Sequence, residues 1–539
     1  MFPREPIFHS GDPEKIWQKF CGFLDLSLKE FMEIQEELLM EQIELVAGSP
    51  LGKKIMNGHK PKSIKEFRQQ VPLTTYEDYA PYIGECQEDS LVVKPGTWIH
   101  TSGRGGKFKW APYTERGLDR LGDAILAELI LGTAEQRGDV RIREGSRFLF
   151  VLAPRPYFSG IASWIFAERF GLKIIPPPAL SEQLTFQDRV KTGFQMAMRD
   201  GMDSVGAVAT VLIKVGESFS QSSQGMKLSP ALLHPKILFR LLRGWLRSKA
   251  AGRPMLPRDL WSVKGLICGG TDASIYKKKL EYFWGKTLHE IYGLTEAGVV
   301  AMQSWLKQGL IFYPYFNFFE FIPEAEWRKS KENKAYQPAT VLINELEVGK
   351  IYEIVVTNFY GMPFLRYRPG DLIKITALEE EGTGIKIPQF IFHARGDDLI
   401  NLYSIVMLDE RTVWEALNNT NISYEDWSVR KEYQKDVPVL SFYLEPKEAT
   451  QADALERLLN EQLRAISPLY KEAIGEVETN PVKVTLLRAG SFQRYYEKMQ
   501  AAGVDLAHLK PPHMSASDTV IQSLLQCSEE KIAEGAGEH

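Results

Sequence analysis

Short apolar runs that alternate with amphipathic helical patterns are the feature that most constrains how this chain can fold. The runs 146–154, 171–178 and 262–270 are closed by Pro or Gly and have the length of buried strands. Residues 24–47 and 117–132 carry apolar residues at helical spacing. Buried strands between such helices predict an α/β domain built on a mixed, largely parallel sheet.

Beyond Arg395 the pattern changes to that of a smaller α+β unit. Four segments are expected to form strand, strand, helix and strand, in that order: 426–433, 438–446, 451–467 and 481–490. We therefore expect an N-terminal domain over 1–396 and a C-terminal domain over 397–539. The latter ends in a polar tail from about Ser515, which we expect to be frayed. The charged stretch 323–338 is expected to be a solvated loop.

Composition excludes several classes of protein. The 65 Lys and Arg against 69 Asp and Glu give a net charge of −4, so no general positive field would attract nucleic acid. The cysteines are widely spaced, which fits reduced thiols: Cys21, Cys86, Cys268 and Cys527. The N-terminus lacks a signal-peptide core, and no apolar run approaches the roughly 18 residues that span a bilayer. We expect a cytoplasmic protein without stable membrane insertion.

The stretch HTSGRGGKFKW, residues 100–110, is rich in glycine and hydroxyl residues. It fits neither the Walker pattern, because Phe108 follows the lysine, nor the dinucleotide fingerprint, because its glycines are too close together. Consecutive glycines can aim backbone N–H groups at an anion, and a lysine adds charge. The candidate anion-binding residues are Ser102, Gly103, Arg104, Gly105, Gly106 and Lys107.

Four further stretches follow in order: GGTDAS (269–274), EIYGLTEAG (290–298), FLRYRPGDLI (364–373) and ARGDDLIN (394–401). Together with the glycine stretch they resemble the signatures of the adenylate-forming superfamily, whose members activate carboxylic acids with ATP. The resemblance implies a large adenylation domain and a small, mobile C-terminal domain.

A narrower resemblance is carried by four other segments: 66–83, 316–324, 347–361 and 490–514. These are similar to the acyl-acid amido synthetases of the auxin-responsive Gretchen Hagen family. That family implies ATP- and magnesium-dependent joining of a small carboxylic acid to an amine, usually an amino acid. Residues 363–371, PFLRYRPGD, resemble phenylacetate–CoA-type ligases about as well. An acyl-CoA ligase with coenzyme A as acceptor, and a degenerate adenylate-binding or interaction protein, therefore stay open as alternatives.

The resemblance implies a role for each candidate residue. The glycine stretch would hold the β- and γ-phosphates. Glu296 would bind Mg²⁺, Thr295 would contact the α-phosphate, and Asp371 would accept hydrogen bonds from the ribose hydroxyls. The remaining roles are adenine contacts for Gly269, Gly270 and Tyr292, a ribose contact for Arg395, a hinge at Asp397, and a mobile catalytic cation at Lys510. Thr271 and Gly293 are further candidate nucleotide-binding residues.

Two features depart from or extend this pattern. Arg104 and Gly105 stand where the resembling families carry hydroxyl residues, so Arg104 would either replace the lost phosphate contacts or mark a loop that has lost ATP turnover. Residues 235–253 form an amphipathic basic helix pattern, in which Arg240, Arg243 and Arg247 stand opposite an apolar set: Leu238, Leu241, Leu242 and Trp245. We expect its apolar face to pack on the core, with an anionic membrane or the phosphates of coenzyme A as alternative partners.

Overall fold

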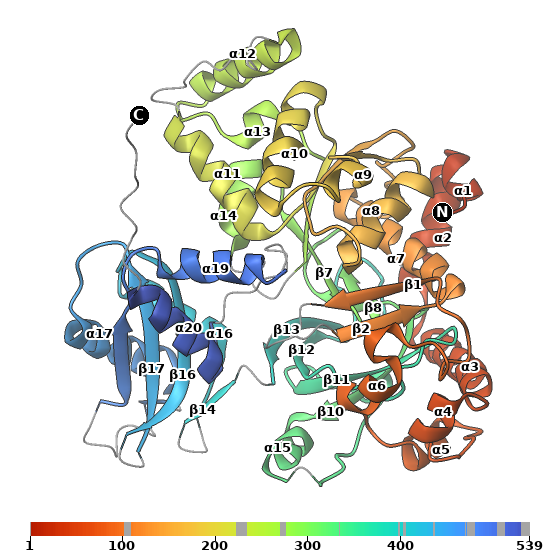
Figure 1. Ribbon diagram of the computed structural model, residues 1–539. Helices are drawn as coiled ribbons and strands as arrows, with labels where there is room; N and C mark the ends of the chain where they lie inside the picture. The colour runs from red at the N-terminus through yellow and green to blue at the C-terminus, as the bar shows by residue number, and fades with distance from the viewer. Residues whose placement is uncertain are drawn as a thin grey trace. The chain divides into compact units, whose positions relative to one another are not determined.

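A computed structural model divides the chain into two compact units, one ending at His393 and the other beginning at Ala394, and each is described by itself (Figure 1). The structure describes residues 2–101, 109–222, 234–269, 276–333, 335–396, 399–402, 406–434, 437–468, 470–471, 480–503 and 513–529. None of the helices in these ranges combines the length and apolarity that crossing a bilayer requires.

The first unit is built on an eleven-stranded mixed sheet of order β10-β11-β12-β13-β9-β8-β7-β6-β5-β3-β4. Strands β7, β6, β5, β3 and β4 pair in parallel, and β8 begins the antiparallel part. The strands predicted within 146–154, 171–178 and 262–270 are confirmed as β3, β4 and β6. The bounds are β3 Arg147–Phe150, β4 Lys173–Ile175, β5 Ser204–Gly206, β6 Gly265–Gly269, β7 Leu288–Leu294, β8 Gly298–Gln303, β9 Leu310–Phe312, β10 Asn317–Pro323, β11 Ile351–Asn358, β12 Asp371–Ala377 and β13 Gln389–Arg395.

Helices cover both faces of this sheet (Figure 1). Helix α7 packs against β6 and β8, and nearly every residue from Gly117 to Thr133 is buried. On the other face Trp261 and Trp284 stack 6.1 Å apart among the apolar residues of α10, α11, α13 and α14. The bounds are α1 Pro6–His9, α2 Pro13–Cys21, α3 Leu28–Val46, α4 Pro50–Ile55, α5 Ile64–Gln70, α6 Tyr76–Ile83, α7 Glu115–Thr133, α8 Phe158–Glu168, α9 Pro178–Ser181, α10 Phe186–Asp200, α11 Ala209–Ser222, α12 Pro235–Ala250, α13 Pro257–Leu260, α14 Lys277–Trp284 and α15 Glu324–Glu332.

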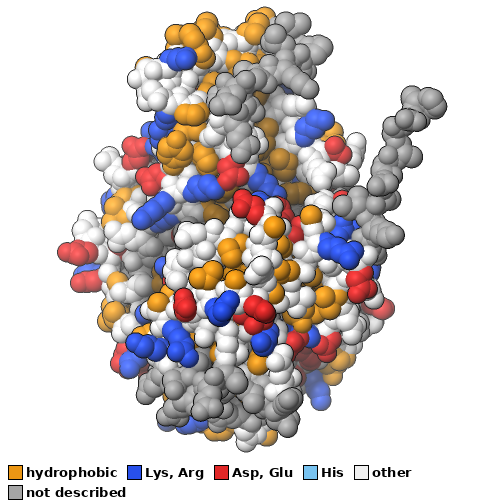
Figure 2. All heavy atoms as spheres, turned by 90° about the vertical axis from the view of Figure 1, so that its left-hand side faces the viewer, with side chains coloured by type: hydrophobic (Ala, Val, Ile, Leu, Met, Phe, Trp, Pro, Cys, Tyr) orange, Lys and Arg blue, Asp and Glu red, His pale blue; other side chains and the backbone are white. Residues whose placement is uncertain are grey.

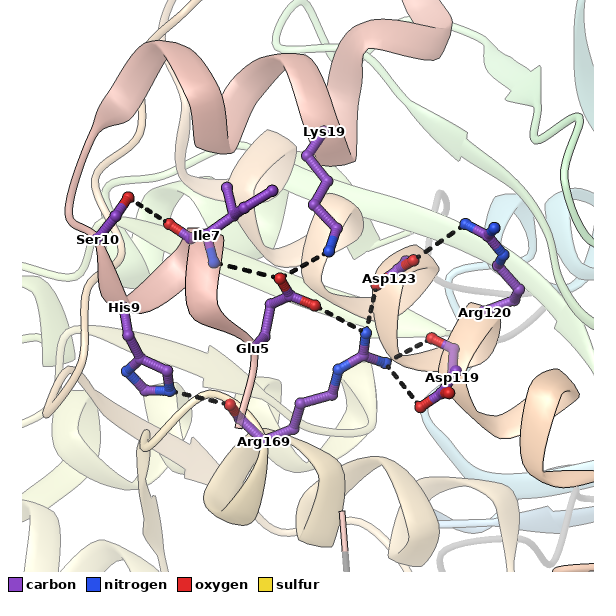
Figure 3. Close-up of polar contacts among 9 residues, drawn as sticks. All are labelled: Glu5, Ile7, His9, Ser10, Lys19, Asp119, Arg120, Asp123 and Arg169. Atoms are coloured by element: carbon purple, nitrogen blue, oxygen red, sulfur yellow. Dashed lines mark hydrogen bonds and ion pairs between the residues drawn. The ribbon is translucent and has the colours of Figure 1, made fainter. Parts of the chain in front are cut away.

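A cluster of buried charges ties the N-terminal segment to α7 (Figure 3). The Arg169 guanidinium donates to Asp123 on α7 at 2.8 Å and to Glu5 at 3.1 Å, and Lys19 lies 2.6 Å from the other oxygen of Glu5. Although burial raises the pKa of Glu5, hydrogen bonds from Lys19 and Arg169 hold it below its usual value. Each buried carboxylate is thus paired with a cation, as burial of charge requires.

The prediction that the charged stretch 323–338 is a loop is wrong for residues 324–332, whereas residues 335–338 lie outside any helix or strand. Residues Glu324–Glu332 form helix α15, which packs against β10 and β11. Its one aromatic side chain, Trp327, is 2% exposed and anchors an otherwise charged helix. A single buried anchor is enough to hold a short helix on a sheet, although it leaves almost no periodic signal in the sequence.

The second unit contains a three-stranded sheet of order β16-β17-β18. β16 and β17 are antiparallel, and α17 carries the chain across to β18, which runs parallel to β17, so the predicted strand, strand, helix, strand order is confirmed. The expectation of a frayed tail is wrong for helix α20, because Ile521, Leu524 and Cys527 are buried with residues of α19; residues 530–539 lie outside the described residues. The bounds are β14 Ile400–Leu402, β15 Val406–Leu408, α16 Glu410–Asn419, β16 Tyr424–Gln434, β17 Val437–Pro446, α17 Ala452–Ile466, β18 Val482–Leu486, α19 Ser491–Ala501 and α20 Asp518–Glu529.

Candidate functional site

The glycine stretch connects two paired strands. β1 (Thr97–Thr101) and β2 (Lys109–Tyr113) are antiparallel, and Thr101 pairs with Lys109 across the ends of the strands. His100 fixes the hairpin, since its ring lies 4.8 Å from Trp110 and 4.4 Å from Tyr157, and burial lowers its pKa. The six candidate phosphate-binding residues themselves lie outside the described residues: Ser102, Gly103, Arg104, Gly105, Gly106 and Lys107.

The Y-G-L-T-E segment forms the turn from β7 to β8, and three buried side chains hold the carbonyl groups of that turn. Each contributes one donor from a different part of the first unit. The bonds run from Tyr113 Oη to Thr295 O (2.7 Å), from Asn358 Nδ2 to Glu296 O (3.0 Å) and from Asn317 Nδ2 to Ala297 O (2.7 Å). The turn is therefore rigidly placed, as a ligand contact needs to be.

A glycine closes this turn for a steric reason. Gly298 has a φ of +61°, and a Cβ added there would lie 2.5 Å from the ring of Phe316. Gly293, one of the candidate nucleotide-binding residues, is the exposed residue before the last residue of β7 and pairs with Val299. The tight approach of these strands leaves the side chains of Thr295 and Glu296 half-buried at the tip.

The Glu296 carboxylate has a defined partner. Tyr367 Oη donates to Glu296 Oε1 at 2.8 Å, and the Tyr367 side chain is buried. Burial and the charge of Glu296 together raise the pKa of Tyr113, and burial with a smaller effect of Glu296 raises that of Tyr76 to about 12. The hydroxyls of Tyr113 and Tyr76 therefore stay protonated at neutral pH, and that of Tyr113 can donate to the Thr295 carbonyl.

Asp371 and Tyr292 meet directly. Tyr292 Oη donates to Asp371 Oδ2 at 2.7 Å, and both residues are buried, with exposed fractions of 8% and 3%. Asp371 begins β12 directly after Gly370, whose φ of +84° turns the chain into the strand. The Tyr292 ring packs edge-on against Phe390 at 5.8 Å. Two candidate residues separated by 79 positions thus form one unit.

Gly269 lies beside this pair. It is the last residue of β6 and pairs in parallel with Ile291, the neighbour of Tyr292 on β7. Ligands of open α/β sheets bind at the carboxyl ends of such parallel strands. Gly270 and Thr271, which follow, lie outside the described residues. Gly269, Tyr292, Gly293, Thr295, Glu296 and Asp371 are thus brought to one edge of the sheet.

The two arginines of R-Y-R-P-G-D have structural partners. Arg366 donates to both carboxylate oxygens of Glu320 on β10, at 2.8 and 2.9 Å, and both side chains are buried. Arg368 contacts Glu353 on β11 at 2.6 Å. Arg366 and Arg368 alternate with Tyr367 along the chain. The two arginines therefore pair with carboxylates of β10 and β11, while the Tyr367 hydroxyl reaches Glu296.

Three further candidate residues belong to the second unit. Arg395 is the last residue of β13, whereas Lys510 and the hinge residue Asp397 lie outside the described residues. His513, three residues after Lys510, is held between two carboxylates. Its Nδ1 lies 2.5 Å from Glu410, and its Nε2 lies 2.8 Å from Asp426.

Sequence reasoning missed the residues that support the site. These are Tyr113, Asn317, Asn358 and Tyr367. Asn317 and Asn358 open and close buried strands of mostly apolar character, and each is itself completely buried. A buried amide at a strand end must find hydrogen-bond partners, so this position was a usable signal. Nothing in the sequence alone distinguishes Tyr113 and Tyr367 from core tyrosines.

Magnesium requires few protein ligands when a nucleotide supplies the rest. Among the described residues no group of three or more His, Cys, Asp or Glu side chains forms a metal cage. A half-buried carboxylate, oriented by Tyr367, stands at Glu296. That arrangement fits a magnesium ion held mainly by phosphate and water oxygens, with one protein carboxylate.

Two family models and several known proteins are similar to this chain. Residues 21–152 match the GH3 family N-terminal domain, and residues 310–395 match the GH3 family central domain. A jasmonoyl–L-amino acid synthetase of Nicotiana attenuata is 22% identical and covers 93% of this chain and 93% of its own length. An indole-3-acetic acid-amido synthetase of Arabidopsis thaliana is 25% identical over 39% of this chain and 35% of its own length.

Solved structures share the fold. An acyl acid amido synthetase in complex with 2,4-DB superimposes with a TM-score of 0.65, at 18% identity, over 98% of both chains. A 2-hydroxyisobutyryl-CoA ligase in the postadenylation state gives a TM-score of 0.62 at 14% identity, over 94% of both chains. The chain therefore shares the fold of these two proteins, with a large mixed sheet and a small C-terminal sheet.

Proposed function

We propose that this chain, which belongs to the GH3 family, uses ATP to activate a carboxylic acid and then joins the acyl group to an amino acid. The synthetases it resembles over 93% and 39% of its length are both named for products in which an acid is conjugated through an amide. The substrates of this chain are accordingly a small carboxylic acid and an amino acid.

The observation that carries the proposal is the Tyr292–Asp371 pair beside Gly269. A buried carboxylate, held by a tyrosine hydroxyl at the carboxyl end of parallel strands, suits a ribose whose two hydroxyls need acceptors. Gly269, Gly270 and Thr271 would allow adenine to lie against backbone, with Tyr292 and Gly293 beside it. Arg395 would add a second ribose contact from the C-terminal unit.

The first step makes an inert acid reactive. A carboxylate oxygen attacks the α-phosphorus of ATP, the bond from that phosphorus to the bridging oxygen breaks, and pyrophosphate leaves. In the second step the amine attacks the acyl carbon, the carbon–oxygen bond to AMP breaks, and the amine loses a proton. Both steps depend on positioning and on neutralising phosphate charge more than on covalent chemistry by the protein.

Three parts of the site would bind the phosphates of ATP and neutralise their charge. Backbone N–H groups of residues 103–106, with Ser102 and Lys107, would bind the β- and γ-phosphates at the tip of the β1–β2 hairpin, where Arg104 would replace lost hydroxyl contacts. Thr295 would contact the α-phosphate. Mg²⁺, held through Glu296, would neutralise charge that develops on the phosphate oxygens.

Lys510 would complete the adenylation site from the C-terminal unit. A cation on a mobile unit can stabilise one half-reaction and withdraw for the next. Domain movement about Asp397 is part of the proposal for the same reason.

The competing functions differ in their products. Coenzyme A as acceptor would give a thioester, and a degenerate protein would bind adenylate without turnover. The decisive measurement is acid-dependent exchange of labelled pyrophosphate into ATP across an acid library, followed by mass detection of the product with amino acids or coenzyme A supplied in turn. An amide product supports the proposal, whereas a thioester alone or the absence of exchange with every acid contradicts it.

A further inference from the structure

Helix α12 exposes one continuous apolar face. Its five large apolar side chains recur at the spacing of a single helical stripe. They are Leu238 (46% exposed), Phe239 (69%), Leu242 (56%), Trp245 (51%) and Leu246 (54%). The expectation that Leu238, Leu242 and Trp245 pack on the core is therefore wrong.

The helix instead buries the neighbouring face, which carries Ile237, and Leu241 packs partly buried against the core as expected. Gly244 and Ser248 are buried, and a Cβ on Gly244 would lie 2.6 Å from Leu260 of α13. Arg240, predicted to be solvated, donates through Nε to the carbonyl oxygen of Met198 at 3.0 Å. Because Arg240 is anchored inward, the orientation of α12 is fixed with its apolar stripe outward. Figure 1 shows α12 at the upper margin of the first unit, and Figure 2 shows hydrophobic side chains gathered there.

The charge around this face is strongly one-sided. No Asp or Glu occurs from residue 218 to residue 258, whereas that stretch holds eight Lys and Arg, in a chain with a net charge of −4. On α12 itself Lys236, Arg243, Arg247 and Lys249 are exposed. Asp200 lies near Lys236, and Asp259 pairs with Arg253, but every charged residue of α12 itself is a cation. A helix with an exposed apolar stripe and only cations is complementary to a surface that is apolar inside and anionic at its boundary.

The exposed apolar stripe and the exposed cations of α12 together favour one kind of binding partner over another. A second copy of this chain would bring two basic surfaces together, and like charges without counterions oppose association. An anionic bilayer meets both requirements, because the acyl chains receive the stripe and the headgroups receive the cations. Tryptophan at the edge of the stripe is also typical of the membrane interface.

We propose that α12 docks the protein reversibly on the surface of an anionic membrane. The apolar stripe enters the boundary between headgroups and acyl chains, while the exposed cations contact lipid phosphates. The helix lies in the plane of the interface and does not span the bilayer. This inference is independent of the proposed ligase activity, since it depends only on α12 and its surroundings.

Vesicle flotation with the full chain tests the proposal. The probes are phosphatidylcholine vesicles and vesicles that also contain phosphatidylglycerol. We expect binding to the anionic vesicles, weakened by salt, and at least tenfold weaker binding to phosphatidylcholine alone. The double variant Leu242→Glu/Trp245→Glu should bind anionic vesicles at least tenfold more weakly, and Arg243→Gln/Lys249→Gln should lose about tenfold together with most of the salt dependence.

The matched control is Val348→Glu/Leu378→Glu, which adds the same charge at two exposed apolar residues, 56% and 47% exposed, outside α12. It should bind like the unmodified chain, and thermal unfolding should show that all variants are folded. Failure of the unmodified chain to bind anionic vesicles overturns the proposal. So does binding by the Leu242→Glu/Trp245→Glu variant that equals the control, or a concentration-dependent dimer that this variant abolishes.

Discussion

The hydroxyl of Tyr292 donates a 2.7 Å hydrogen bond to Asp371, and this bond joins the end of β7 to the start of β12. The two residues come from separate sequence signatures, Y-G-L-T-E and R-Y-R-P-G-D. Since Tyr292 holds one oxygen of the carboxylate, it fixes the direction in which Asp371 can accept further hydrogen bonds. In the proposed function this pair would present a preformed acceptor to the two ribose hydroxyls.

The first prediction concerns the tyrosine. Tyr292→Phe removes the donor to a buried carboxylate, a bond worth about 1.5–3 kcal/mol. We expect the KM for ATP in pyrophosphate exchange to rise at least tenfold, because Asp371 loses its orientation. Tyr352→Phe is the control, since it removes a hydroxyl that accepts from Glu347 N at 3.2 Å. Equal effects of the two substitutions on KM would contradict a role in binding ATP.

The second prediction concerns the carboxylate itself. Asp371→Ala should abolish measurable exchange, because the ribose hydroxyls lose their acceptor. Asp371→Asn keeps the size of the side chain and one acceptor oxygen, so it should retain weak ATP binding in a calorimetric titration. Unchanged exchange by Asp371→Ala in a folded sample would refute the ribose assignment.

The third prediction concerns magnesium. Tyr367→Phe removes the hydrogen bond that orients Glu296, made at 2.8 Å. We expect the Mg²⁺ concentration for half-maximal exchange to rise several-fold, with a smaller change in the KM for the acid. Glu296→Gln should give the larger shift in the same titration. A Tyr367→Phe enzyme with an unaltered magnesium dependence would show that this tyrosine is only a core residue.

The main strands of the fold could be predicted from the sequence because burial on both faces leaves continuous apolar runs. The 146–154 run, for example, contains β3, and the β-β-α-β order of the second unit follows from alternating patterns. Helix α15 could not be predicted in this way, because one buried tryptophan among charged residues carries no period.

The candidate site was predictable as a set of signatures but not as a geometry. Tyr292 and Asp371 were both identified, yet their contact spans 79 positions and depends on the pairing of strands. Asn317 and Asn358 donate to backbone carbonyl groups of the turn. Because a turn of any sequence has such carbonyl groups, the sequence does not indicate that these two residues would contact them. The orientation of α12 was mispredicted because an amphipathic pattern gives two faces and does not state which one is buried.

The fourth prediction concerns stability of the first unit. Arg366→Met leaves the Glu320 carboxylate without the partner that donates at 2.8 and 2.9 Å, and it also removes a donor to the carbonyl of Val71. Breaking a buried ion pair costs about 3–5 kcal/mol, so the free energy of unfolding should fall by that amount. The double variant Arg366→Met/Glu320→Leu should recover part of the loss in denaturant unfolding. A double variant less stable than Arg366→Met would contradict the pairing.

The fifth prediction concerns pH and the second unit. Burial lowers the pKa of His513, but hydrogen bonds and charge from Asp426 and Glu410 raise it to about 10. In the unfolded chain the pKa is about 6.5, so the folded state holds the proton more tightly. The stabilisation is therefore complete below about pH 6.5 and is lost as pH rises through about 10.

The His513→Gln variant tests this assignment, since glutamine keeps a polar side chain but does not titrate. Its melting temperature should lie below that of the unmodified chain at pH 6 and converge with it above pH 10. Because His513 lies three residues after Lys510, the variant should also slow pyrophosphate exchange more than it slows transfer from a supplied acyl-adenylate. His289→Gln is the matched control in the first unit, where His289 contacts Glu128 at 3.0 Å. A constant difference in melting temperature from pH 6 to pH 10 would rule out the buried imidazolium at His513.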